Sequence, residues 1–276
     1  HPGWLSLAPQ RHVRDLAAGG DGLRVWLATW GGVLCWTPAD GRVERHASDH
    51  GLLGNAVRCV AVDPAGVVWA GQDAGLCALD LTGGLTDGPT GGLTSGLTGG
   101  GWAPQAALAG RAVVRLAARA AGGVWVAVRD ADGRGALGHV AAPGAPFRVL
   151  VEDALACTDV AALLADGDAV WTATPWGVFG CRAGEDPVFV DLSVDADGRR
   201  DVQVQVAALA PDPDGGLWAG TNWGLFALPG ALGGGRGGTA AAARVPGVPA
   251  APVSALAREW GSERLWVVTD AGVGVL

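Results

Sequence analysis

Residues 212–228 read DPDGGLWAGTNWGLFAL, and five other segments of the chain repeat this pattern with variations. Each segment has an apolar run that contains Trp, a short linker that ends at Gly, and a second apolar run. The repeated tryptophans are 43, 56, 46, 47 and 48 residues apart, and they are Trp26, Trp69, Trp125, Trp171, Trp218 and Trp266. A period of this length predicts a repeat architecture.

Each repeat is predicted to be a small antiparallel sheet. Turns of the Asp-Gly type between short apolar runs are typical of hairpins. The quoted repeat is expected to form strands at 206–212, 216–221 and 224–228, followed by a weakly marked fourth strand. Four such strands in about 45 residues are typical of a propeller blade. We therefore predict an all-β, six-bladed β-propeller of four-stranded antiparallel blades, with each repeated Trp packed between neighbouring blades.

The repeats account for the whole chain, so we expect a single β-propeller domain over 1–276. The last repeat ends after its third strand, and residues 1–10 are expected to join that blade as its fourth strand and close the ring. Residues 82–101 are rich in Gly, Thr and Leu and are expected to be an insertion in the second blade. The six blades are expected at about 11–48, 55–101, 111–150, 157–192, 202–245 and 252–276.

The composition excludes several classes of partner. The net charge is -8 and the basic residues are scattered, which argues against nucleic acid or an anionic membrane surface. No apolar run reaches 18 residues, so we expect this segment to make no membrane contact. The skewed alphabet, rich in Ala, Gly, Val and Arg, indicates a high-GC bacterial genome. Because the chain lacks Met, we expect that a leader or a signalling domain lies outside the sequence given.

The five cysteines have no spacing typical of a metal site. We expect them to be small buried apolar residues, with a bridge inside the second blade, Cys59 to Cys77, left open. They are Cys35, Cys59, Cys77, Cys157 and Cys181.

Two segments, GNAVRCVAVDPAGVVWAGQDAGLCALD at 54–80 and VAALAPDPDGGLWAGTNWGLFALPG at 206–230, resemble the repeats of the two-component-regulator propeller family. The resemblance covers the whole chain, although the third repeat departs through its longer RDADGRG linker. It implies the extracytoplasmic sensor part of a bacterial signalling receptor, and hence a periplasmic or secreted protein. Members often carry two seven-bladed propellers, whereas this sequence has six repeats, so a free-standing binding propeller and a cytoplasmic location also stay open.

The linkers between the second and third strands of each blade are expected at the mouth of a central channel, where propellers usually bind ligands. Three of them carry an extra tryptophan, at positions that the sequence suggests are matching. These indoles are expected either to form an aromatic platform for a saccharide or another flat ligand, or to pack between blades. They are Trp30, Trp176 and Trp223, and the polar residues in these linkers are Asp73, Arg129, Asn222 and Asp270.

Residues at the start of each inner strand are expected to line the same mouth. A ring of mixed donors and acceptors there suits recognition of a polar ligand, although solvated strand ends have the same composition. The candidate ligand-binding residues are His12, Arg14, Asn55 and Arg58, with Arg111, Thr158, Asp159, Gln203 and Gln205 beside them.

These features favour a ligand-binding or sensing module that uses no cofactor and no metal. One alternative is a lactonase-like hydrolase that holds a divalent metal ion with Asp15, Asn55 and Asp159. Another alternative is a scaffold for protein interactions. An enzyme is the weaker interpretation, because the sequence has no nucleophile elbow, phosphate loop or HExxH motif. The histidines nearest the predicted mouth, His12 and His50, also have no carboxylate at a telling spacing.

Overall fold

The computed structural model describes residues 12–18, 24–81, 101–167, 169–190, 192, 204–212, 215–228, 242–258 and 264–276. The chain forms two compact units, His1–Val149 and Leu150–Leu276. The described residues form six antiparallel sheets, numbered here in chain order, and three short 3-10 helices. The described part of the chain contains no helix with the length and apolar character needed to traverse a bilayer.

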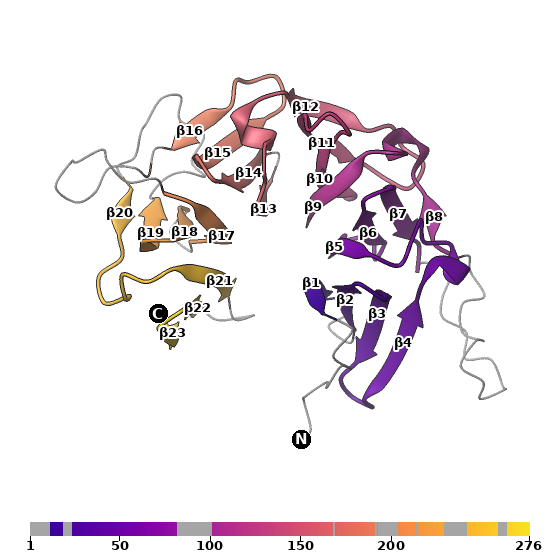
Figure 1. Ribbon diagram of the computed structural model, residues 1–276, viewed down its shortest axis with the longest axis horizontal. Helices are drawn as coiled ribbons and strands as arrows, with labels where there is room; N and C mark the ends of the chain where they lie inside the picture. The colour runs from indigo at the N-terminus through magenta and orange to yellow at the C-terminus, as the bar shows by residue number, and fades with distance from the viewer. Residues whose placement is uncertain are drawn as a thin grey trace. The chain divides into compact units, whose positions relative to one another are not determined.

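The first three sheets begin in the first unit (Figure 1). The first sheet has β1 (Val13–Ala18), β2 (Val25–Thr29), β3 (Gly32–Thr37) and β4 (Arg42–His46). The second has β5 (Val57–Val62), β6 (Val68–Gln72), β7 (Gly75–Leu79) and β8 (Ala103–Pro104). The third has β9 (Ala112–Ala118), β10 (Val124–Arg129), β11 (Gly135–Val140) and β12 (Arg148–Glu152). The short helices η1 (Ser48–His50) and η2 (Ala106–Leu108) follow β4 and β8.

The other three sheets lie in the second unit. After η3 (Leu155–Cys157), the fourth sheet has β13 (Ala162–Asp166), β14 (Ala169–Thr174), β15 (Gly177–Arg182) and β16 (Val188–Val190). The fifth has β17 (Val206–Pro211), β18 (Leu217–Thr221), β19 (Gly224–Leu228) and β20 (Ala243–Arg244). The sixth has β21 (Val253–Arg258), β22 (Leu265–Thr269) and β23 (Gly272–Val275).

The predicted fold class is confirmed: the protein is an all-β, six-bladed β-propeller of antiparallel sheets, each paired in chain order. Five sheets have four strands, and the sixth has three among the described residues. The predicted closing strand at 1–10 lies outside the described residues, so closure stays a prediction. Most of the predicted insertion, residues 82–100, also lies outside them, and the outer strand β8 begins at Ala103, just beyond the expected end of that blade.

Four of the repeated tryptophans pack between sheets, as predicted. Trp69 on β6 lies in a core cluster with Val113 of β9, and Trp171 on β14 lies in a cluster with Val206 of β17. Trp26 lies in a cluster with Val57 of β5, and Trp218 packs against a cluster that contains Val253 of β21. Trp125 is buried, at 2% exposure. Trp218 is half-buried and Trp266 is 42% exposed, so the expected burial fails at Trp266, which lies on the three-stranded sheet.

Two glycines of the WAG pattern leave room for a side chain of the next sheet. A Cβ atom added at Gly71 would lie 2.5 Å from Cγ1 of Val113 on β9. One added at Gly220 would lie 2.6 Å from Cγ1 of Val253 on β21. These distances are far below van der Waals contact, so Gly at this position lets neighbouring sheets approach closely.

Candidate functional site

The turns between the second and third strands share one hydrogen-bond pattern in four sheets. A threonine at the end of the second strand donates its hydroxyl to the carbonyl of the residue three positions later. The same hydroxyl oxygen accepts the backbone N–H two positions later. The turn therefore has a fixed conformation, in which the closing glycine has a positive φ such as +140° at Gly177. These threonines are Thr29, Thr174, Thr221 and Thr269.

This pattern shows that the three extra tryptophans do not hold matching positions, in contrast to the prediction. Trp176 and Trp223 donate their backbone N–H to the threonine two residues before them. In the first sheet that bond comes from Gly31, so Trp30 lies one position earlier in its turn. The linkers TWGG, TPWG and TNWG show the same difference, since Trp is the second residue of the first linker and the third residue of the other two. All three side chains are exposed, by 53% at Trp30, 43% at Trp176 and 49% at Trp223, so none packs as core.

The earlier turn position, which Trp30 shares with Asp73 and Asn222, contacts the beginning of the first strand of the same sheet. The guanidinium carbon of Arg14 lies 4.5 Å from the centre of the Trp30 ring. Arg58 forms an ion pair with Asp73. These contacts bring together four predicted site residues as two pairs. In the fifth sheet, the backbone N–H of Gln205 donates to the Asn222 side-chain oxygen over 2.9 Å.

A β-bulge lies at this end of the first strand in five of the six described sheets. In the second sheet, Val57 pairs with Gln72 and Cys59 with Gly71, which leaves Arg58 as the extra residue. The extra residue shifts the alternation of the strand by one, so Val57 and Cys59 lie in different core clusters. The residues at this position are Arg14, Arg58, Val114, Ala207 and Ser254.

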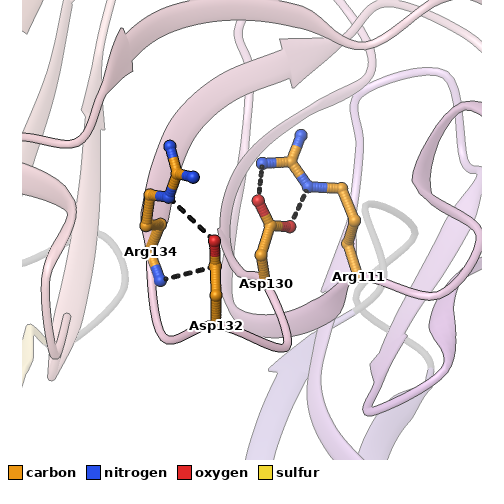
Figure 2. Close-up of polar contacts among 4 residues, drawn as sticks. All are labelled: Arg111, Asp130, Asp132 and Arg134. Carbon is orange, nitrogen blue, oxygen red and sulfur yellow. Dashed lines mark hydrogen bonds and ion pairs between the residues drawn. The ribbon is translucent and has the colours of Figure 1, made fainter.

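The longer linker of the third sheet carries two ion pairs (Figure 2). Arg111 donates from Nε to Oδ1 of Asp130 over 2.6 Å and from a terminal nitrogen to Oδ2 over 3.2 Å. Asp132 accepts the backbone N–H and the Nε–H of Arg134, and these bonds lower the pKa of its carboxyl. The sequence placed Arg111 and Arg129 near a site but missed Asp130, because the linker length hides which position faces the first strand.

The remaining predicted site residues lie apart from these pairs. His12 is exposed ahead of β1, and the side-chain oxygen of Asn55 accepts the N–H of Ser48 at the start of η1 over 3.0 Å. Arg129 ends β10, half-buried. The backbone N–H of Asp270 donates to the carbonyl of Pro252, which fastens its turn to the strand β21. Gln203 lies outside the described residues.

The lactonase alternative gains no support from the residues considered for it. Oδ2 of Asp15 accepts the N–H of Val60 on the neighbouring sheet over 3.0 Å, and burial raises the pKa of this carboxyl. Asp15 thus connects two sheets. In the described ranges, no three His, Cys, Asp or Glu side chains gather in a group that could hold a metal ion.

All five cysteines are buried free thiols, so the bridge between Cys59 and Cys77 does not form. Burial raises the pKa of the Cys77 thiol to about 11 and that of Cys181 to about 12. These thiols are protonated at neutral pH, which makes them poor nucleophiles. Burial likewise lowers the pKa of His46 to about 4, with a smaller effect of His50. His46 packs against Trp26 and is a core side chain rather than a base.

Comparisons with known proteins agree on the fold and differ in function. No protein-family model matches the sequence, and no curated protein matches it. The β-propeller domain of Cps50 (Swd1) from Myceliophteria thermophila is 14% identical with a TM-score of 0.60, over 96% of this chain and 82% of that one. Hydrazine synthase from Kuenenia stuttgartiensis is 12% identical with a TM-score of 0.64, over 96% of this chain and 83% of that one.

A third similar structure is PorZ, a bacterial surface component of the type-IX secretion system of Porphyromonas gingivalis. It is 17% identical with a TM-score of 0.64, over 95% of this chain. The chain spans only 38% of the length of PorZ. At such low identities the likeness shows the propeller fold alone, since one fold hosts many activities.

Proposed function

We propose that this protein is a ligand-binding or sensing propeller module whose ligand, a saccharide or another molecule with a flat apolar face, binds at the turns between second and third strands. The observation that carries this proposal is the pair of exposed indoles of Trp176 and Trp223. Each lies at the same position of a threonine-fixed turn. A turn has no packing need for a large ring, and exposed apolar side chains that gather in one place mark interaction sites.

The two turns lie in neighbouring sheets of the second unit. β13 and β14 of the fourth sheet pack against β17 of the fifth, so corresponding strand ends of the two sheets face the same way. Among the described residues, neither indole contacts another ring or a cation. Both rings are therefore available to a ligand. Stacking on a Trp face combines apolar contact with an indole N–H that donates to a hydroxyl.

The sensing part of the proposal rests on the repeat motif. Its resemblance to two-component-regulator propellers supports an extracytoplasmic role, periplasmic or secreted, in which ligand binding is passed to a signalling domain outside this chain. The acidic net charge of -8 supports a small-molecule or oligosaccharide ligand rather than nucleic acid.

The test is binding of neutral oligosaccharides to the whole chain, measured by isothermal titration calorimetry. Replacing Trp176 and Trp223 together by Ala is expected to weaken binding at least about thirtyfold, since each stacked ring contributes on the order of 1–3 kcal/mol and about 1.4 kcal/mol corresponds to a factor of ten. The matched control is Trp266→Ala, which removes an indole of similar exposure that lies within a strand. Equal losses in the control, or no saccharide bound by the unaltered chain, would contradict the proposal.

The same substitutions distinguish a platform from packing. Because both rings are exposed, the double variant is expected to unfold within about 1 kcal/mol of the unaltered chain in urea. A loss of several kcal/mol would show that the rings stabilise the sheets instead.

A further inference from the structure

Two arginine side chains meet at the β2–β3 turn of the first sheet, one from each flanking strand. Arg14 on β1 places its guanidinium over the ring of Trp30, 4.5 Å from the ring centre. Arg45 on β4 donates its Nε–H to the carbonyl of Gly31, the next residue of the turn, over 2.7 Å. Both arginines are exposed. Two positive charges are therefore held at one short turn.

Arg58, which holds the position of Arg14 in the second sheet, is neutralised, and so is Arg111 ahead of β9 in the third sheet, whereas Arg14 and Arg45 are not. Arg58 pairs with Asp73, and Arg111 pairs through two hydrogen bonds with Asp130. In the first sheet the position of Asp73 is taken by Trp30. Among the described residues no carboxylate lies within ion-pair distance of Arg14 or Arg45.

The acidic residues near this turn in the chain are already engaged elsewhere. Asp15 directs its carboxylate to the N–H groups of Leu16 and Val60. Glu44 forms an ion pair with Arg42 over 2.8 Å. Asp49 bonds to the ring of His50 over 2.7 Å. The positive charge at the turn therefore has no built-in counterion in the described part of the first sheet.

The contacts that hold the two guanidinium groups leave their donors available. The contact of Arg14 with Trp30 is a cation–π contact, which gives the guanidinium N–H groups no oxygen acceptor. Among the described residues, Arg45 donates from Nε alone, so its terminal nitrogens stay open. A guanidinium fork matches the paired oxygens of a carboxylate, sulfate or phosphate. The indole of Trp30 remains 53% exposed and offers apolar surface beside these donors.

We propose that this turn binds the oxyanion of an acidic saccharide, a carboxylate or a sulfate ester, with Arg14 and Arg45 holding the anion and Trp30 contacting the sugar ring. The proposal rests on the proposed function and names its ligand class. It also assigns a role to Trp30, the third tryptophan of the predicted platform. Trp30 does not share the turn position of Trp176 and Trp223, and Arg14 lies over its ring.

The experiment is calorimetric titration of the whole chain with a galacturonic acid trisaccharide, a neutral galactose trisaccharide and a sulfated galactose trisaccharide. At least one acidic ligand is expected to bind about tenfold more tightly than the neutral one at low salt, because charge-assisted hydrogen bonds are the stronger kind. The advantage is expected to shrink as sodium chloride is added. The preferred acidic ligand identifies the oxyanion, and equal binding of all three would overturn the proposal.

Substitutions assign the effect to the turn. Arg14→Gln and Arg45→Gln are each expected to remove most of the preference for the acidic ligand over the neutral one. Arg58→Gln is the matched control, since that side chain is already paired with Asp73. An equal loss in the control would show that the preference for the acidic ligand depends on the net charge of the protein, and it would overturn the proposal. Arg14→Lys keeps the charge without the fork and is expected to recover only part of the preference, while circular dichroism verifies that each variant is folded.

The two proposals fail separately. If neutral saccharides bind and the double Trp176 and Trp223 variant loses them, while acidic ligands bind no better, the oxyanion site is wrong and the proposed function stands. If no saccharide of either kind binds, both are wrong.

Discussion

The second and third sheets share a tight turn before the repeated Trp. The turn begins with the acidic Asp63 in the second sheet and with the basic Arg119 in the third. Asp63 and Arg119 each lie six residues before the repeated Trp of their sheet, and each closes a tight turn by donating its backbone N–H to the carbonyl four residues on. The buried carboxylate of Asp63 accepts the N–H groups of Ala65, Val67 and the Trp69 indole. It also accepts the N–H of Gly123 in the third sheet, so this one side chain fastens two sheets together.

The third sheet lacks this arrangement. Arg119 stacks over Trp125 at 5.1 Å and donates to the carbonyl of Gly122. Within the described residues, the buried indole N–H of Trp125 and the Nε–H of Arg119 find no hydrogen-bond acceptor. Both tryptophans are nonetheless buried. The difference teaches that ring burial holds either sheet, and that the aspartate adds a polar network which the third sheet lacks.

The largest expected effect is on removal of the carboxylate. Asp63→Ala removes the acceptor of four N–H groups, three of them in buried bonds, and we expect the free energy of unfolding to fall by about 4 kcal/mol. Urea denaturation measures the loss. The control is Asp73→Ala, an exposed carboxylate in a surface ion pair, which is expected to cost less than about 1 kcal/mol. If the two variants were equally stable, the network would not matter.

A smaller effect is expected from the two indole N–H groups. Trp69→Phe removes a hydrogen bond to Asp63 and some ring surface, whereas Trp125→Phe removes ring surface alone. We expect Trp69→Phe to be the more costly by about 1–2 kcal/mol in urea unfolding. Equal costs would mean that the bond to Asp63 contributes nothing to stability.

The comparison is sharpened by placing an aspartate, the residue of the second sheet, at the equivalent position 119 of the third sheet. In Arg119→Asp the new carboxylate lies where it can accept the Trp125 indole N–H, which has no acceptor among the described residues. We expect a gain of about 1 kcal/mol in the free energy of unfolding. Arg119→Ala serves as control, since it removes the stacked cation without adding an acceptor. A variant Arg119→Asp that is less stable than Arg119→Ala would refute the transfer.

The smallest expected effect is a loss of stability at acidic pH that comes from His139 in the third sheet. His139 packs edge-on against Trp125 at 5.3 Å, and its pKa is lowered by burial and then by Arg119 and Arg148. The folded state therefore favours the neutral ring, so stability is present above the unfolded pKa of 6.5 and is lost as the pH falls below it. His139→Gln is expected to be less acid-sensitive than the unaltered chain in thermal unfolding between pH 7 and pH 5. An unchanged pH dependence would contradict this.

Local patterns predicted the strands well. The strands expected at 216–221 and 224–228 are found as Leu217–Thr221 and Gly224–Leu228, because alternation and turn residues are properties of neighbours in the chain. The same logic placed four of the six repeated tryptophans between sheets. It does not extend to Trp266, whose burial depends on what covers the three-stranded sheet rather than on its own repeat.

The side-chain partners were beyond such patterns. The bond from Gly123 to Asp63 spans sixty residues, and neither repeat has a sequence feature that predicts it. The turn position of Trp30 could be read from the linker TWGG, but its contact with Arg14 could not. Arg45 reaches the turn from a fourth strand that the sequence marks only weakly. The candidate site could therefore be predicted as a set of turns, but not as pairs of interacting side chains.

The bulge at the beginning of the first strands has a consequence for how such a protein diversifies. The extra residue has no pairing partner on the second strand, so its identity can change while the strand pairing on both sides of it is kept. Arg14, Arg58 and Ala207 already occupy that place in three sheets. Selection, or an engineer, can thus exchange recognition chemistry one repeat at a time without disturbing the scaffold that presents it.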